Sequence, residues 1–77
     1  MKEFFSTSDL AITTALSVYF PISSINKDNP RKAEFIFERS KEFDDLVNRY
    51  WNRELLVEPR QYFYQLKAIK ARLYGSE

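Results

Sequence analysis

The pattern of apolar and polar positions in the first twenty residues predicts a short strand followed by a helix. Residues 3–6 are expected to form the strand, and Ser6 or Thr7 the N-cap of the helix, with Asp9 completing a capping box. Apolar residues then recur at helical spacing on one arc: Ala11, Ile12, Ala15, Leu16, Val18 and Tyr19. The polar residues between them are expected to face away from the core: Thr13, Thr14 and Ser17.

A β-hairpin is predicted after this helix. Pro21 ends the helix near Phe20, because the residue before a proline disfavours helical geometry. Residues 22–27 and 32–38 are expected to be strands, joined through the turn signal of residues 28–31 by a loop of about four to six residues. In the second of these strands Ala33, Phe35 and Phe37 alternate with polar residues, and Ile36 is the exception on the polar side.

The spacing after residue 40 predicts a second, core-facing helix. Ser40 is the expected N-cap, and the acidic residues of the first turn complement the helix dipole: Glu42, Asp44 and Asp45. The apolar stripe has the helical period: Phe43, Leu46, Val47 and Tyr50. Trp51 borders this stripe, and Asn52 is expected to be the left-handed residue where the chain leaves the helix. The short connector 53–57 is partly apolar and is expected to pack against the domain.

A third helix has both of its ends marked in the sequence. Glu58 is expected to accept backbone N–H bonds, Pro59 fits the first helical position, and Gly75 fits the left-handed exit. One side of this helix carries an apolar stripe: Tyr62, Leu66, Ile69 and Leu73.

The order of elements is therefore β-α-β-β-α-α, which predicts a single small α+β domain over residues 1–77. A right-handed crossover between the first two strands leaves room for the third strand between them. We expect a small three-stranded sheet, antiparallel or mixed, with strand order 2-3-1 and covered by helices. An uncovered face or edge of this sheet would be available to a partner.

Composition narrows the possible functions. Hydrophobic residues make up 44% of the chain and aromatic residues 17%, which is enough for a core. The chain has no Cys and no His, so disulfides, thiolate or imidazole metal ligands, and catalysis by either residue are excluded. It also lacks a signal-peptide pattern and any apolar run near the roughly 20 residues of a membrane span, so we expect a cytoplasmic, soluble protein without a membrane partner.

No constellation for catalysis is found in the sequence. Phosphate-binding loops, dinucleotide fingerprints and nucleophile elbows are absent. Asp44 and Asp45 are adjacent, but neighbouring residues on a helix point about 100° apart. We therefore expect a protein that is not an enzyme and has no cofactor, metal or small-molecule substrate.

Several short motifs together resemble a known family. They are Thr7-Ser8-Asp9-Leu10-Ala11, Asn29-Pro30-Arg31 before the strand at 34–38, Tyr50-Trp51, Pro59-Arg60-Gln61-Tyr62-Phe63, Leu66-Lys67 and Leu73-Tyr74. The chain resembles a family of very small prokaryotic proteins catalogued only as a domain of unknown function. This resemblance spans nearly the whole chain and implies a compact prokaryotic domain, and it carries no activity to any residue.

The last helix contains the most concentrated candidate binding surface. The net charge of the chain is only +1, whereas residues 59–77 carry four basic side chains against Glu77 alone, a local charge of +3. The candidate face interleaves these charges with aromatic rings: Arg60, Tyr64, Lys67, Lys70 and Tyr74. Arg31 and Lys32 on the hairpin offer a second basic contact, while Ile36 and Trp51 are further candidates for an exposed interface.

Two functions fit these residues. In the first, the seven Phe, five Tyr and one Trp exceed what a small core needs, and the surplus serves protein binding or self-association. In the second, the basic-aromatic helix face binds nucleic acid through phosphate contacts and base stacking. The alternative for that face is a solvated helix surface with its Tyr hydroxyls in water.

Overall fold

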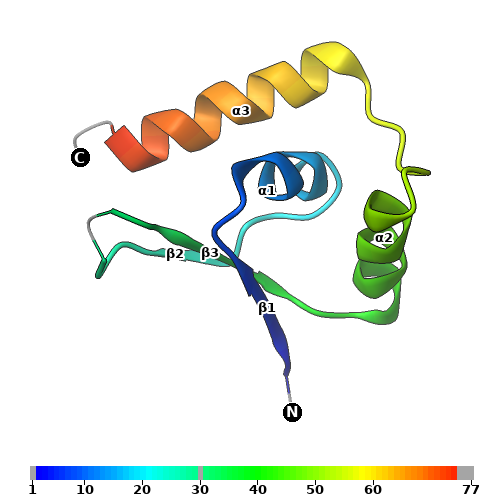
Figure 1. Cartoon of the computed structure of the whole chain (residues 1–77), viewed down its shortest axis with the longest axis horizontal. Helices are drawn as coiled ribbons and strands as arrows, with labels where there is room; N and C mark the ends of the chain where they lie inside the picture. Colours follow the sequence, from blue (N-terminus) through cyan, green and yellow to red (C-terminus); the bar gives the residue numbers. More distant parts are fainter. Residues whose placement is uncertain (1, 30, 75–77) are drawn as a thin grey trace.

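The computed structural model describes residues 2–29 and 31–74 (Figure 1). In chain order its elements are β1 (Phe4–Thr7), α1 (Leu10–Ser17), β2 (Ser24–Asn26), β3 (Glu34–Glu38), α2 (Lys41–Trp51) and α3 (Pro59–Tyr74). The predicted β-α-β-β-α-α order and the α+β class are confirmed. Pro30 and Gly75, to which a turn and a helix exit were assigned, lie outside the described residues.

The sheet has the predicted strand order, with β3 between β1 and β2. Both pairings are antiparallel, and the register places Phe5 opposite Phe37, while Thr7 and Ile25 lie on either side of Phe35. Because side chains alternate between the two faces of a sheet, these residues share one face. Phe35 and Phe37 are buried on it. Ile36 points to the other face, where it lies between Ser6 and Ser24.

The core is organised around Phe43 of α2. The Phe43 ring centroid lies 5.5 Å from that of Phe5, 5.4 Å from that of Phe20 and 5.3 Å from that of Phe37. Tilted and edge-to-face pairs at this distance suit the charge distribution of aromatic rings. Phe43 therefore joins α2 to β1, to β3 and to the segment that follows α1.

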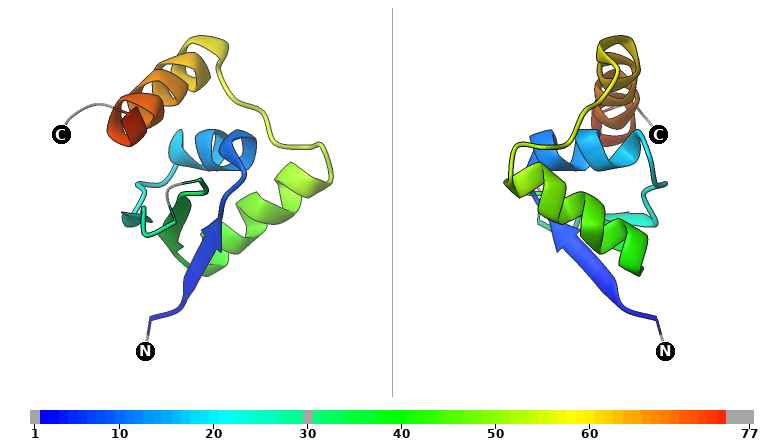
Figure 2. Two further views of the ribbon diagram at one scale, coloured as in Figure 1. Left: turned by 60° about the vertical axis from the view of Figure 1, so that its left-hand side comes forward. Right: turned by 90° about the vertical axis from the view of Figure 1, so that its right-hand side faces the viewer.

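The central helix is α1, which lies between the sheet and α3 in the views of Figures 1 and 2 and contacts both α2 and α3. Neighbouring elements cover α1 on several sides. The prediction that its polar residues face away from the core is therefore wrong: Thr13 and Thr14 are fully buried. Their hydroxyls donate to the carbonyl oxygens of Asp9 at 2.8 Å and Leu10 at 2.7 Å. These bonds satisfy the two hydroxyls inside the core.

The N-cap of α1 is Asp9 and not Ser6 or Thr7 as predicted. Asp9 Oδ1 accepts a hydrogen bond of 2.8 Å from the amide of Ala11. Thr7 still belongs to β1, where it pairs with Phe35, so the helix can begin only after it. The Thr7 hydroxyl instead accepts a bond from the Asp9 amide.

The hairpin connection is longer than expected, because β2 ends at Asn26 and β3 begins only at Glu34. Two asparagine side chains shape it: Asn26 Oδ1 accepts from the Asp28 amide and Asn29 Oδ1 accepts from the Arg31 amide, both at 2.9 Å. Such side-chain bonds offer the backbone an alternative to ladder bonds and are typical of turns.

The remaining helix predictions are confirmed at their starts and along their buried stripes. The Phe43 amide donates to Ser40 Oγ at 3.0 Å, and the Gln61 amide donates to Glu58 Oε1 at 2.9 Å. Ile69 is the buried residue of the α3 stripe, and its other members are half-buried: Tyr62, Leu66 and Leu73.

Replacing Phe43 with alanine should remove most of the stability of the domain. We expect Phe43→Ala to lower the free energy of unfolding by about 3–5 kcal/mol, because a large buried ring is lost and a cavity remains. The matched control is Phe63→Ala, at an exposed position of α3, which should change it by less than about 0.5 kcal/mol. Urea denaturation measures both, and a loss below about 1 kcal/mol for Phe43→Ala would contradict this description of the core.

Candidate functional site

The outward side of α3 is the first candidate site. Successive residues on a helix are rotated by about 100°, so residues on the side away from the buried stripe form one strip. The strip contains Arg60, Phe63, Tyr64, Lys67, Lys70 and Tyr74, and all six are exposed. We call these six residues the basic-aromatic face. The structure thus brings together the five residues predicted from the sequence and adds Phe63, one turn before Lys67.

The cations of this face have few acidic partners. No acidic residue occurs between Pro59 and Tyr74. Arg60 Nε lies 3.8 Å from Glu58 Oε2, while Lys67 and Lys70 form no ion pair with any residue that the structure describes. Lys67 Nζ instead lies 5.4 Å from the centre of the Phe63 ring, a cation–π contact. The face is therefore available to an anionic partner.

A groove between the helices is the second candidate site. Its volume is about 540 Å³, and it lies where α1, the end of α2, the connector and the start of α3 meet. Its lining is Ala11, Ala15, Tyr50, Trp51, Arg53, Leu55, Val57 and Tyr62. Ala11 and Ala15 are one turn apart, so they lie on one side of α1, and their small side chains leave this space unfilled. We call it the α1–α2–α3 groove.

Aromatic side chains form one wall of this groove. The Tyr50 and Trp51 rings meet edge to face with centroids 5.2 Å apart, and Trp51 remains 63% exposed. Burial raises the pKa of the Tyr50 phenol, and the nearby Asp9 carboxylate and Tyr62 raise that pKa further. The phenol therefore loses its proton only at a higher pH than an ordinary tyrosine does.

The residue in the left-handed conformation is Arg53, with φ of 62°, and not Asn52 as predicted. The helical turn continues through Asn52, whose amide bonds to the Asn48 carbonyl. The Arg53 amide then bonds to the Tyr50 carbonyl, and the Glu54 amide to the Arg49 carbonyl. This pair of bonds is a Schellman motif, whose left-handed position is most often glycine. An arginine there carries backbone strain, and this arginine lines the groove.

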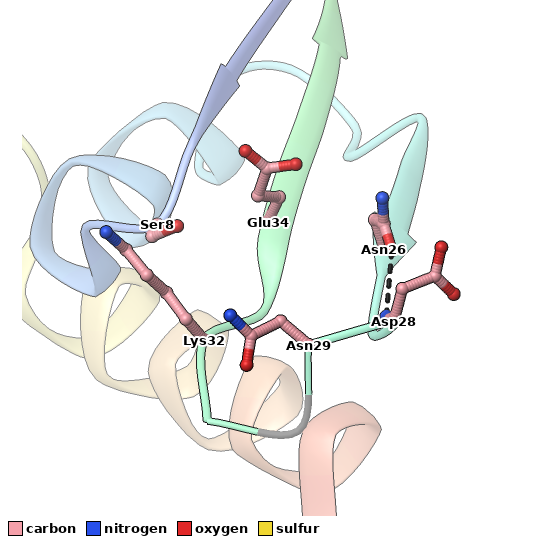
Figure 3. Close-up of a pocket in the computed structure, with 6 residues that line it drawn as sticks. All are labelled: Ser8, Asn26, Asp28, Asn29, Lys32 and Glu34. Carbon is pink, nitrogen blue, oxygen red and sulfur yellow. Dashed lines mark hydrogen bonds between the residues drawn. The ribbon is translucent and has the colours of Figure 1, made fainter.

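A polar hollow at the hairpin loop is the third feature (Figure 3). Its volume is about 300 Å³, and its lining is Ser8, Asn26, Asp28, Asn29, Lys32 and Glu34. The carboxylates of Asp28 and Glu34 point in different directions, and Asn26 is occupied by its bond from the Asp28 amide. The hollow therefore lacks a converging set of ligands.

The secondary residues predicted from the sequence do not form one site. Lys32 lines the polar hollow and Arg31 lies in the exposed loop beside it. Ile36 is half-buried on the open face of the sheet, and Trp51 lines the groove. Across residues 2–29 and 31–74, no group of three or more acidic side chains is placed to hold a metal ion. Within the same residues, no helix is long and apolar enough to cross a membrane.

Comparison with known proteins identifies the family. The model of a domain of unknown function, DUF5659, matches residues 2–75. The chain belongs to the DUF5659 family. Searches of curated proteins and of solved structures found no match. The DUF5659 match covers both the basic-aromatic face and the groove.

The groove was not anticipated from the sequence, although two of its features had a visible signal. Ala11 and Ala15 have helical spacing, but the same spacing predicts them as core residues of the apolar arc. Arg53 lies two residues after the end of α2, near the expected helix exit, but the left-handed region favours asparagine over arginine, so the sequence indicates Asn52. The junction of four segments that forms the groove is a tertiary feature.

Relief of the strain at Arg53 gives a test of this geometry. Arg53→Gly should raise the free energy of unfolding by about 0.5–1 kcal/mol, because glycine adopts positive φ without steric cost. Arg53→Ala removes the same side chain and keeps the strain, so it should not stabilise the protein. Urea denaturation of both variants measures the difference, and equal stability of the two would contradict a left-handed residue 53.

Proposed function

We propose that this chain is a non-catalytic binding module of the prokaryotic cytoplasm that docks a protein partner in the α1–α2–α3 groove. The observation that carries the proposal is the strained Arg53 in the lining of the groove. Strained backbone persists only where the surrounding structure enforces it, and such residues cluster at functional sites. Glycine would be the more stable choice at this position, so the arginine costs stability here.

The chemistry of the groove indicates what the partner presents. Its lining is mainly apolar and includes Leu55, Val57 and the contacting rings of Tyr50 and Trp51. A groove of about 540 Å³ accepts a few large apolar side chains. Trp, Tyr and Arg are the residue types that most often dominate binding energy in interfaces. The complementary surface is therefore a short apolar segment with an acidic residue that pairs with Arg53.

Self-association is the related form of this proposal. Small domains have limited core area, and dimerisation supplements their stability. The exposed Trp51 lines the groove, and either a second copy or a different protein would cover it. The two cases differ in sedimentation, because only self-association makes the apparent mass depend on protein concentration.

Filling the groove with a side chain tests the proposal. Ala11 is exposed at the groove, so Ala11→Phe should place a ring there, leave the fold intact and prevent capture of the partner. The matched control is Ala71→Phe, which adds the same ring at an exposed alanine of α3 outside the groove. Ala71 lies four residues after Lys67, on the side of the basic-aromatic face, so the two variants are compared after nuclease treatment. Each variant serves as bait in cells of the source organism, with and without nuclease, and bound proteins are quantified by mass spectrometry.

After nuclease treatment, we expect the same partners to be captured by the unmodified chain and by Ala71→Phe, but not by Ala11→Phe. Capture that is equal for all three baits would show that the groove is not the docking site. Capture that disappears entirely with nuclease would show that the interaction depends on nucleic acid and would overturn the proposal of a directly bound protein.

A further inference from the structure

We propose that the basic-aromatic face of α3 is a second binding site, separate from the groove, and that its ligand is single-stranded nucleic acid. The groove is lined by Tyr62, which lies on the buried stripe of α3, whereas the basic-aromatic face lies on the outward side of the same helix. A ligand on one surface therefore leaves the other accessible. The two proposals can fail independently.

Charge complementarity is the first argument. The face presents Arg60, Lys67 and Lys70 with no acidic residue anywhere along α3. Among residues 2–29 and 31–74, the ion pair of this face is the one between Arg60 and Glu58, at the long distance of 3.8 Å. Opposite charges three or four residues apart on a helix stabilise each other, and α3 offers its lysines no such acidic partner. Two lysines without an ion pair among the described residues, together with Arg60, favour a polyanion.

Exposed aromatic rings are the second argument. On this face Phe63 is 58% exposed, Tyr64 69% and Tyr74 81%. Most of each ring is in water, where it adds little to the fold, whereas each ring offers a stacking surface to an unpaired base. Arg60 and Tyr74 are fourteen residues apart, or about 21 Å along the helix axis, so cations and rings follow one another over the length of a few nucleotides.

The arrangement favours a single strand over the other polyanions. Paired bases in a duplex are stacked on each other, so they cannot stack on protein rings. A helix that lies in a membrane surface needs a continuous apolar stripe, with its cations on the opposite side. Here the charges lie within the aromatic strip, and Lys67 Nζ is held above the Phe63 ring. Interleaving of this kind suits alternating phosphates and bases.

Salt dependence of binding tests the charge argument. The probe is a fluorescently labelled thymidylate oligomer of about 12 nucleotides, and anisotropy gives its affinity between about 20 and 200 mM salt. Three phosphate contacts predict a slope of about −2 for the logarithm of affinity against the logarithm of salt concentration. Lys67→Gln/Lys70→Gln should reduce the slope to about −0.7. The control Lys41→Gln/Arg49→Gln removes the same charge from α2 and should leave the slope unchanged.

Loss of the rings tests the stacking argument. Tyr64→Ala/Tyr74→Ala should weaken binding of the oligomer at least about tenfold at fixed salt while leaving the salt slope unchanged. Alanine favours the helix, so this variant should fold, and circular dichroism confirms that it does. Duplex of the same length, phosphatidylserine vesicles and polyglutamate are the competing probes.

The proposal is supported if the protein binds all three competing probes more weakly than the oligomer, and if the lysine and tyrosine variants behave as described above. It is overturned by absence of oligomer binding at about 20 mM salt, or by a tyrosine variant that binds the oligomer like the unmodified chain. Preference for the vesicles, the duplex or polyglutamate would also overturn it. None of these results bears on capture of a protein at the groove.

Discussion

The packing of Phe43 against Phe5, Phe20 and Phe37 is the interaction on which the rest of the structure depends. A three-stranded sheet of short strands and an eleven-residue helix are each too small to be stable alone. The four rings connect β1, β3, α2 and the segment after α1 in one cluster. Once these elements are joined, α1 is enclosed among them, which explains why its threonines are buried and why they bond to its own backbone.

This compact core leaves α3 as an outer element. Ile69 reaches the core cluster with the half-buried Leu73, and Lys27 Nζ donates to the Arg72 carbonyl at 2.7 Å, so one side of α3 is committed to packing. Its other side is free, and so is the groove at its first turns. The basic-aromatic face therefore lies apart from the packing stripe of α3, whereas Tyr62 belongs both to that stripe and to the lining of the groove.

Most of the fold could be predicted from the sequence, because the spacing of apolar residues and the capping residues of helices are local properties. The alternation of Phe35 and Phe37, the Ser40 cap and the stripes of α2 and α3 all followed from spacing. The burial of Thr13 and Thr14 could not be predicted, because their polarity indicated solvent and only the position of α1 among its neighbours shows otherwise. Likewise, the basic-aromatic face is readable from one helix, whereas the groove requires four segments to meet.

The exposed rings of α3 lie outside the packed core. The most direct measurement is the free energy of unfolding of Phe63→Gln/Tyr64→Gln/Tyr74→Gln, obtained by urea denaturation. Glutamine has a higher helix propensity than phenylalanine or tyrosine, so this variant should match or exceed the stability of the unmodified chain, within about 1 kcal/mol. A loss of more than about 2 kcal/mol would show that the three rings contribute to packing, and would contradict the separation of core and binding surface.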